Sequence, residues 1–273
     1  MIAVVIGGGT MGAGIAHLLL AGGHEVVLLD AADRLDAARG AVATSLTKAA
    51  ERGKLTAAPD ELLARLAVVD RLDPTPAGLV VEAVPEDLDL KRRVLATAAD
   101  ACPDAVLASN TSSLSIGALA EGLPGDRVLG MHFFNPVPVQ QLVELVRHDG
   151  VAPEVVAKAR RWAEELGKTV IEVRDAPGFA TSRLGVAVGM EAIRMLEEGV
   201  ASAEDIDTGM RLGYGWPMGP LRLTDLVGLD VRLAIAEHLA AELGPRFAPP
   251  DLLRAKVAEG HLGRKTGQGF FTW

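Results

Sequence analysis

Residues 2–12 read Ile2-Ala-Val-Val-Ile-Gly-Gly-Gly-Thr-Met-Gly12, and this stretch decides the fold of the first part of the chain. The five apolar residues predict a buried strand, and the glycines match the G-x-G-x-x-G pattern of a turn between a strand and a helix. In that pattern the first glycine permits a tight turn, the second lets the backbone approach a pyrophosphate, and the third lets the helix pack closely on the sheet. Phosphates would bind the N–H groups at the start of the helix. The predicted dinucleotide site comprises Gly7, Gly9, Thr10, Met11 and Gly12.

A second apolar run, Glu25–Leu29, ends at an acidic residue, Asp30. A carboxylate at the end of the second strand can accept hydrogen bonds from both ribose hydroxyls, and it would repel the 2′-phosphate of NADP. The expected cofactor is therefore NAD. The alternative is that Asp30 only caps the helix that follows.

The composition excludes several classes of protein. The chain has 273 residues, 49% hydrophobic and 23% charged, which is enough for one large core and a smaller one. A net charge of −9, without a basic block or zinc-type spacing, argues against a nucleic-acid partner and predicts no metal site. The single cysteine, Cys102, excludes an intramolecular disulfide and indicates a reducing compartment. No apolar stretch approaches the ~20 residues of a membrane span, and the chain opens on its first strand without a signal peptide, so we expect a cytoplasmic protein.

The pattern of predicted elements changes near Pro177. Strand and helix patterns alternate up to the strand 169–173, which predicts an α/β fold with a Rossmann-type, doubly wound, mostly parallel sheet. Only helical spacing follows. We therefore expect an NAD-binding domain over residues 1–176 and a smaller all-helical domain over residues 177–273 that contributes to the substrate cleft. Its apolar helices are too numerous for so small a domain to bury alone, which favours a homodimer formed through them.

A histidine and a glutamate, His132 and Glu144, lie twelve positions apart in the run Met131-His-Phe-Phe-Asn-Pro-Val-Pro-Val-Gln-Gln-Leu-Val-Glu144. A carboxylate beside an imidazole fixes the tautomer of the ring and stabilises it when it becomes charged. The pair therefore indicates acid–base chemistry. The alternative is a structural histidine and a solvated glutamate at the edge of an apolar run.

The chain resembles the L-3-hydroxyacyl-CoA dehydrogenases over essentially its whole length. Besides the glycine turn, the resemblance is carried by the segments Val81–Glu86, Ser109–Leu114, His132–Pro138, Asp175–Phe179, Tyr214–Pro220 and Gly263–Phe271. It implies an oxidoreductase of fatty acid metabolism that interconverts (S)-3-hydroxyacyl-CoA and 3-oxoacyl-CoA with NAD(H). A short acyl group such as 3-hydroxybutyryl is expected.

The resemblance also implies roles for individual residues. His132 would act as acid and base on the C3 oxygen, Glu144 would orient it, and Ser112 would donate a hydrogen bond near the substrate oxygens. The residues implied near the nicotinamide and its ribose are Glu86, Lys91, Ser109 and Asn135. For the serines between 109 and 115 the alternative is a strand end followed by a helix cap.

Ser182 departs from the family pattern, in which many relatives carry Asn at this position. A hydroxyl can donate one hydrogen bond, but it cannot both donate and accept at the reach of an amide. We still expect Ser182 to contact the substrate, with positioning that depends more on Ser112 or on a water.

Evidence for CoA comes from the helical region after Asp30, which contacts CoA in the family. Cations on an acidic protein suit CoA phosphates, although a solvated helix face is the alternative for each of them. The residues expected to contact CoA are Ser45, Arg52 and Lys54. Two other functions stay open: a dehydrogenase of a free 3-hydroxy acid, such as a sugar acid or carnitine, and a nucleotide-binding protein without turnover. The basic region favours CoA over the first, and an intact His132 and Glu144 argue against the second.

Overall fold

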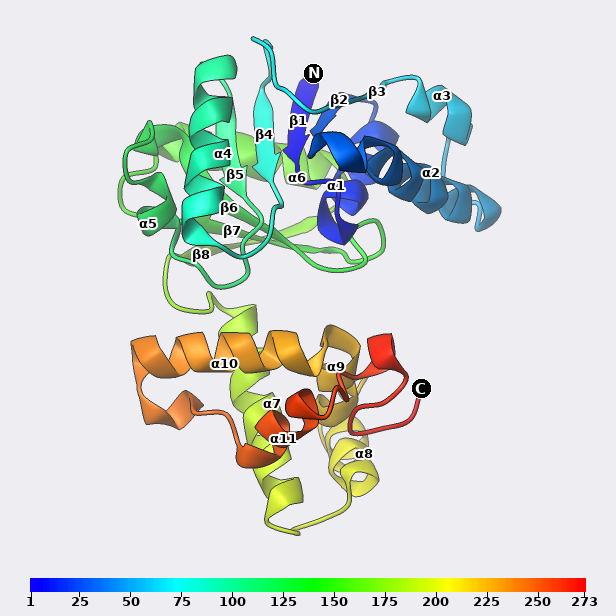
Figure 1. The fold of residues 1–273 in the computed structure, drawn as a ribbon, viewed down its shortest axis with the longest axis vertical. Coiled ribbons are helices and arrows are strands. Elements are labelled where there is room, and N and C mark those ends of the chain that lie inside the picture. The colour runs from blue at the N-terminus through cyan, green and yellow to red at the C-terminus, as the bar shows by residue number, and fades with distance from the viewer. The chain divides into compact units, whose positions relative to one another are not determined.

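The computed structural model describes all 273 residues and divides into two compact units, Met1–Asp175 and Ala176–Trp273 (Figure 1). The first unit contains one eight-stranded sheet in the order β3-β2-β1-β4-β5-β6-β7-β8. Its strands are β1 Ile2–Ile6, β2 Glu25–Leu29, β3 Leu66–Val69, β4 Leu79–Glu82, β5 Val106–Ser109, β6 Val128–Phe133, β7 Leu142–Arg147 and β8 Thr169–Arg174. All neighbouring strands are parallel except β6 and β7. The expected α/β fold with a mostly parallel sheet is confirmed.

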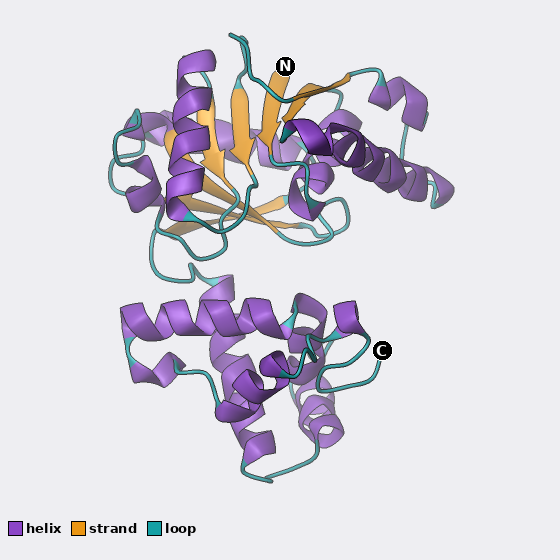
Figure 2. Cartoon of the chain, in the orientation of Figure 1, coloured by secondary structure: helices purple, strands orange, loops and turns teal.

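Helices cover both faces of this sheet (Figure 2), which is why its strands are apolar runs rather than alternating patterns. Residues 3–6 of β1, for example, are at most 2% exposed. Helices α1, α2 and α6 share one hydrophobic core with the strands. The helices of the unit are α1 Thr10–Ala21, α2 Leu35–Glu51, α3 Pro59–Leu63, α4 Leu88–Ala101, α5 Ile116–Ala120 and α6 Pro153–Glu165, with short 3-10 turns η1 Ala32–Arg34 and η2 Gly125–Arg127.

The carboxyl ends of the parallel strands meet at one edge of the sheet, where ligands bind in folds of this type. Backbone hydrogen bonds continue past the strand ends: Gly7 N–H donates to the Leu29 carbonyl, Ala83 N–H to Ile6, and Asn110 N–H to Glu82. The glycine turn after β1 therefore lies beside the loops that follow β2 and β4, and the loop after β5 lies beside the one after β4. Because β6 is parallel to β5, its carboxyl end, which carries His132, lies on this edge as well.

The second unit is all-helical, as expected. It contains α7 Thr181–Glu197, α8 Ala203–Gly213, α9 Pro220–Val227, α10 Leu229–Leu243 and α11 Asp251–Ala258, with 3-10 turns η3 Pro245–Phe247 and η4 Arg264–Thr266. No helix of the chain is both long enough and apolar enough to cross a membrane.

The carboxylate of Asp225 on α9 anchors the C-terminal segment of the second unit. Its oxygens accept hydrogen bonds from the N–H groups of Phe270 and Phe271 and from Nε1 of Trp273, at 2.8 to 2.9 Å. A Cβ at Gly269 would overlap this carboxylate, so the segment needs glycine there. A buried carboxylate with three donors is fully satisfied, and it closes the unit around its core.

Candidate active site

The glycine turn has the shape that a dinucleotide phosphate requires. Gly7 has a φ of 97°, and a Cβ at Gly12 would overlap the Gly7 carbonyl oxygen, so both glycines are needed by the turn itself. At Gly9, in contrast, a Cβ would meet no protein atom within 4 Å. No side chain caps the N-terminus of α1. The first N–H groups of the helix and the open space at Gly9 thus fit an incoming pyrophosphate.

The carboxylate of Asp30 supports this turn, and its expected contact with the ribose stays a prediction. Its Oδ2 accepts a hydrogen bond from Gly8 N–H and its Oδ1 from Ala31 N–H, both at 2.8 Å. Each oxygen has a second lone pair, so the carboxylate can still accept ribose hydroxyls. The Nε of Arg34, whose side chain is 58% exposed, lies 3.5 Å from Oδ2.

His132 and Glu144 face each other across the antiparallel pair of β6 and β7. His132 Nδ1 lies 2.7 Å from Glu144 Oε2, and the two side chains are 9% and 0% exposed. A neutral ring that donates its Nδ1–H to the carboxylate carries its lone pair on Nε2, the nitrogen that can then take up a proton. The ring of Phe134 lies 4.5 Å from the imidazole, centroid to centroid. The structure therefore brings together the two residues that the sequence predicts to act as a pair.

Glu86 organises the loop that carries Ser112. Its Oε1 accepts hydrogen bonds from the Thr111 hydroxyl at 2.6 Å, from Ser112 N–H at 2.9 Å, and from the hydroxyls of Ser112 and Ser113 at 3.3 and 3.2 Å. Its Oε2 lies 3.3 Å from Lys91 Nζ. Burial alone would raise the pKa of the Glu86 carboxyl, but the Lys91 ammonium and the hydrogen bonds from Thr111 and Ser112 hold that pKa below its usual value. The loop is thus bound to an ionised carboxylate at neutral pH.

A second carboxylate, Glu82, lies beneath this loop and was not singled out from the sequence. Lys91 Nζ lies 2.8 Å from Glu82 Oε1, and the Ser109 hydroxyl donates to Glu82 Oε2 at 2.6 Å. Lys91 and Ser109 are buried at 1% and 0% exposure, so both bind Glu82 from within the protein. Their implied contact with the nicotinamide ribose stays a prediction. The available signal was an acid at the end of the apolar run Leu79–Glu82.

The loop between β6 and β7, which carries the exposed Asn135, is held by a buried lysine. Lys168 Nζ donates to the carbonyls of Val137 and Gln140, both at 2.7 Å. Val137 in turn packs so closely on α1 that a Cβ at Gly14 would lie 3.0 Å from it. Lys168 follows the C-terminus of α6 and was not singled out from the sequence. No sequence signal marked its role.

Residues expected to contact the substrate lie in both units. On α2 the Ser45 hydroxyl is 2.7 Å from His17 Nδ1, while Arg52 and Lys54 are exposed just beyond the helix. Burial, and then the charge of Lys168, lower the pKa of His17 to about 4, so His17 is neutral at pH 7. Ser182 is half-buried in the first turn of α7. The substrate roles of these residues stay predictions.

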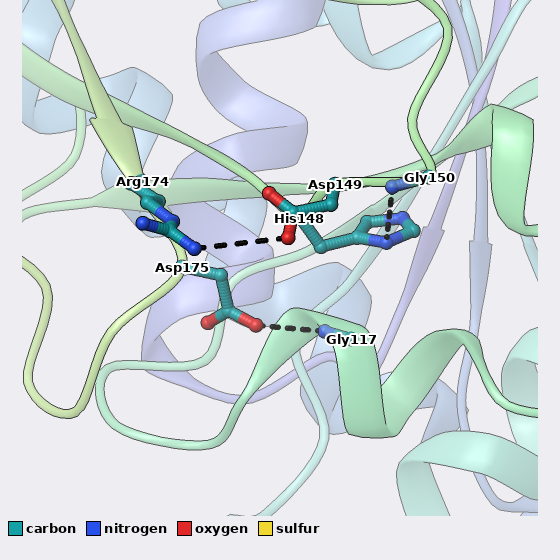
Figure 3. A pocket seen from close by; sticks show the side chains of 6 residues that line it. All are labelled: Gly117, His148, Asp149, Gly150, Arg174 and Asp175. Carbon is teal, nitrogen blue, oxygen red and sulfur yellow. Dashed lines mark hydrogen bonds and ion pairs between the residues drawn. The ribbon is translucent and has the colours of Figure 1, made fainter.

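A shallow pocket elsewhere in the first unit contains none of the predicted site residues. It is lined by Gly117, His148, Asp149, Gly150, Arg174 and Asp175 (Figure 3). Asp175 Oδ2 accepts hydrogen bonds from Gly117 N–H and from the Ser115 hydroxyl, both at 2.8 Å. The last residue of the first unit therefore holds the start of α5, directly after the serine loop.

Comparisons with known proteins cover nearly the whole chain. The family model described as "3-hydroxyacyl-CoA dehydrogenase, NAD binding domain" matches residues 2–176, and the model described as "3-hydroxyacyl-CoA dehydrogenase, C-terminal domain" matches residues 178–273. The chain is 43% identical to a probable 3-hydroxybutyryl-CoA dehydrogenase of Deinococcus radiodurans, over 98% of this chain and 99% of that protein. It is 41% identical to the 3-hydroxyadipyl-CoA dehydrogenase of Escherichia coli, over 98% of this chain and 58% of that protein.

A solved structure agrees in fold. The crystal structure of (S)-3-hydroxybutyryl-CoA dehydrogenase PaaH1 from Ralstonia eutropha matches with a TM-score of 0.93 and 40% identity, over 100% of this chain and 98% of that one.

The hydrogen bonds at Glu86 generate a pH-dependent contribution to stability. Glu86→Gln should lower the free energy of unfolding at pH 7, because it removes the negative charge that Lys91 and the hydrogen bonds stabilise. The loss should be on the order of 1 kcal/mol, since the Glu86 carboxylate is partly solvated. The folded-state pKa lies below the usual 4.5, so this stabilisation is complete above the unfolded-state pKa and is lost as the pH falls through the folded-state value. Urea unfolding of wild type and variant between pH 3 and 7 measures it, with the exposed Glu51→Gln as control. A difference that grows on acidification would contradict the assignment.

Proposed function

The chain belongs to the 3-hydroxyacyl-CoA dehydrogenase family, and we propose that it interconverts short-chain (S)-3-hydroxyacyl-CoA and 3-oxoacyl-CoA with NAD(H). The observation that carries this proposal is the buried pair of His132 and Glu144 at the sheet edge that also holds the glycine turn. The 3-hydroxybutyryl group is the acyl group in the names of two of the relatives above. When bound, NAD accepts the hydride from C3 of the hydroxyacyl group, and NADH returns it in the reverse direction.

His132 moves the proton in this proposal. Its Nε2 removes the proton from the C3 hydroxyl during oxidation and returns it to the C3 oxygen during reduction, a contribution of about 10²- to 10⁴-fold in rate. Glu144 holds the tautomer and stabilises the imidazolium that forms. Ser112 donates a hydrogen bond to a substrate oxygen. The hydrogen bond from Ser112 N–H to Glu86 restricts where the Ser112 hydroxyl can lie.

The remaining predicted contacts belong to cofactor and substrate binding. Glu86 and Asn135 lie near the nicotinamide and its ribose, and Ser182 offers one hydrogen bond to the acyl group. The exposed Arg52 and Lys54 suit the phosphates of CoA, with Ser45 on the preceding helix. The single cysteine, Cys102, is buried as a free thiol, which suits a reducing cytoplasm.

We also propose a homodimer formed through the helical unit. Seven of the nine exposed large hydrophobic side chains lie in this unit, namely Leu184, Val200, Leu212, Tyr214, Val227, Val231 and Trp273. Surface hydrophobics concentrated in this way indicate an interface. Light scattering of the wild type should give twice the mass of one chain. Leu212→Glu should lower the measured mass towards that of a single chain. A monomeric wild type would contradict the proposal.

Steady-state rates with acetoacetyl-CoA and with free acetoacetate, each with NADH and NADPH, test the proposed function. We expect kcat/KM for acetoacetyl-CoA to exceed that for acetoacetate by at least about 10²-fold, because the CoA contacts contribute binding energy. We expect kcat/KM with NADH to exceed kcat/KM with NADPH by at least about tenfold, because Asp30 repels a 2′-phosphate.

Two variants separate the contributions to cofactor choice. Asp30→Asn should narrow the preference for NADH, whereas Arg39→Gln should not, since Arg39 is hydrogen-bonded to the Leu66 carbonyl. A wild type that prefers the free acid would favour the alternative of a free 3-hydroxy acid dehydrogenase. Equal kcat/KM values with NADH and NADPH would indicate that Arg34 binds the 2′-phosphate of NADPH.

A further inference from the structure

The helical unit contains a buried positive charge without a counter-ion, the guanidinium of Arg232 on α10. Arg232 is 6% exposed, and its Nε is buried without a hydrogen-bond partner. Burial lowers the pKa of Arg232 to about 10, so the side chain is still charged at pH 7. A buried charge destabilises the folded state unless an oppositely charged group pairs with it. A ligand that brings a negative charge to Arg232 would therefore bind strongly.

None of the acidic residues of the two neighbouring helices, α7 and α10, forms an ion pair with Arg232. Asp230, two residues before Arg232, pairs with Lys265 at 2.6 Å, and Glu237, further along α10, pairs with Arg254. On α7, Glu191 pairs with Arg194 at 3.2 Å. Glu197 on α7 accepts a hydrogen bond from Leu252 N–H at 2.8 Å, and Glu242 on α10 is exposed. Neither helix therefore supplies the counter-charge of the buried guanidinium.

The guanidinium lies against α7, one turn from Ser182. A Cβ at Gly185 would lie 3.0 Å from Nη1 and 3.5 Å from Nη2 of Arg232, so the missing side chain leaves the space that the guanidinium occupies. Ser182 precedes Gly185 by three residues, which puts both on one face of the helix with a rise of about 4.5 Å between them. Arg232 is thus one helical turn from the residue expected at the acyl group.

We propose that Arg232 binds a carboxylate at the far end of the acyl group, so that this chain acts on 3-hydroxyacyl-CoA substrates with a terminal carboxylate. The inference rests on the proposed function, in which Ser182 contacts the acyl group. A guanidinium offers two parallel N–H donors that match a carboxylate, whereas a terminal methyl would leave the buried charge unpaired. In a six-carbon acyl group, three C–C bonds of about 1.5 Å separate C3 from the terminal carbon, a reach of about 4 Å that matches one helical turn.

Matched substrates test the proposal on the full-length enzyme with NADH. Acetoacetyl-CoA reports the basic reaction, and 3-oxohexanoyl-CoA and 3-oxoadipyl-CoA have the same chain length but end in a methyl and a carboxylate. We expect wild-type kcat/KM for 3-oxoadipyl-CoA to exceed that for 3-oxohexanoyl-CoA by at least about tenfold, as a site built for a polar group discriminates strongly. Arg232→Met should lower this ratio at least about tenfold. Arg211→Met, an exposed change on α8, should leave it unaltered.

Several results would overturn the proposal. A wild type without preference between the two six-carbon substrates would do so without any variant, even if Arg232→Met failed to fold. An equal loss on all substrates in Arg232→Met would indicate a structural role, because only a contact with the terminal group changes the ratio. A halved mass of this variant in light scattering would assign the counter-charge to a second copy of the chain. If the enzyme reduces acetoacetyl-CoA but shows no preference between 3-oxohexanoyl-CoA and 3-oxoadipyl-CoA, only this inference is wrong. If it reduces none of the three substrates, the proposed function is wrong.

Discussion

The antiparallel pairing of β6 with β7 is the constraint on which the site depends. It sets His132 directly opposite Glu144, so that a buried carboxylate meets the imidazole at 2.7 Å. A shift of one residue in this register would turn one of the two side chains to the other face of the sheet. Because β6 is also parallel to β5, the same strand carries the imidazole to the edge where the glycine turn lies. One strand therefore joins the proposed acid–base chemistry to the proposed cofactor site.

Carboxylates that accept several hydrogen bonds do most of the remaining positioning. Glu82 connects β4 to Lys91 on α4 and to Ser109 on β5, and Glu86 extends this network to the loop of Ser112. Such a network is rigid when every member is satisfied, and removal of one partner of a buried ion pair typically costs about 3–5 kcal/mol. In the helical unit Asp225 has the corresponding role. Arg232 is the exception, since its buried charge has no such partner.

The sequence predicted the fold class and the central pair because both depend on local patterns. Apolar runs, the glycine turn and helical spacing mark elements of a doubly wound sheet, but they do not encode strand direction, so the antiparallel β7 could not be read from them. Glu82 was missed because an acid that ends an apolar run usually meets solvent. Lys168 and Arg232 were missed for a similar reason, because only tertiary packing shows that a long cationic side chain is buried.

The central claim is that His132, held by Glu144, moves the proton. The most direct measurement compares His132→Gln with wild type in the reduction of acetoacetyl-CoA by NADH, with His148→Gln as control and with the Kd for NADH measured by fluorescence. The account predicts a fall in kcat of about 10²- to 10⁴-fold with a nearly unchanged Kd, because a general acid acts in the transition state. Retention of more than about a tenth of the wild-type kcat would contradict it.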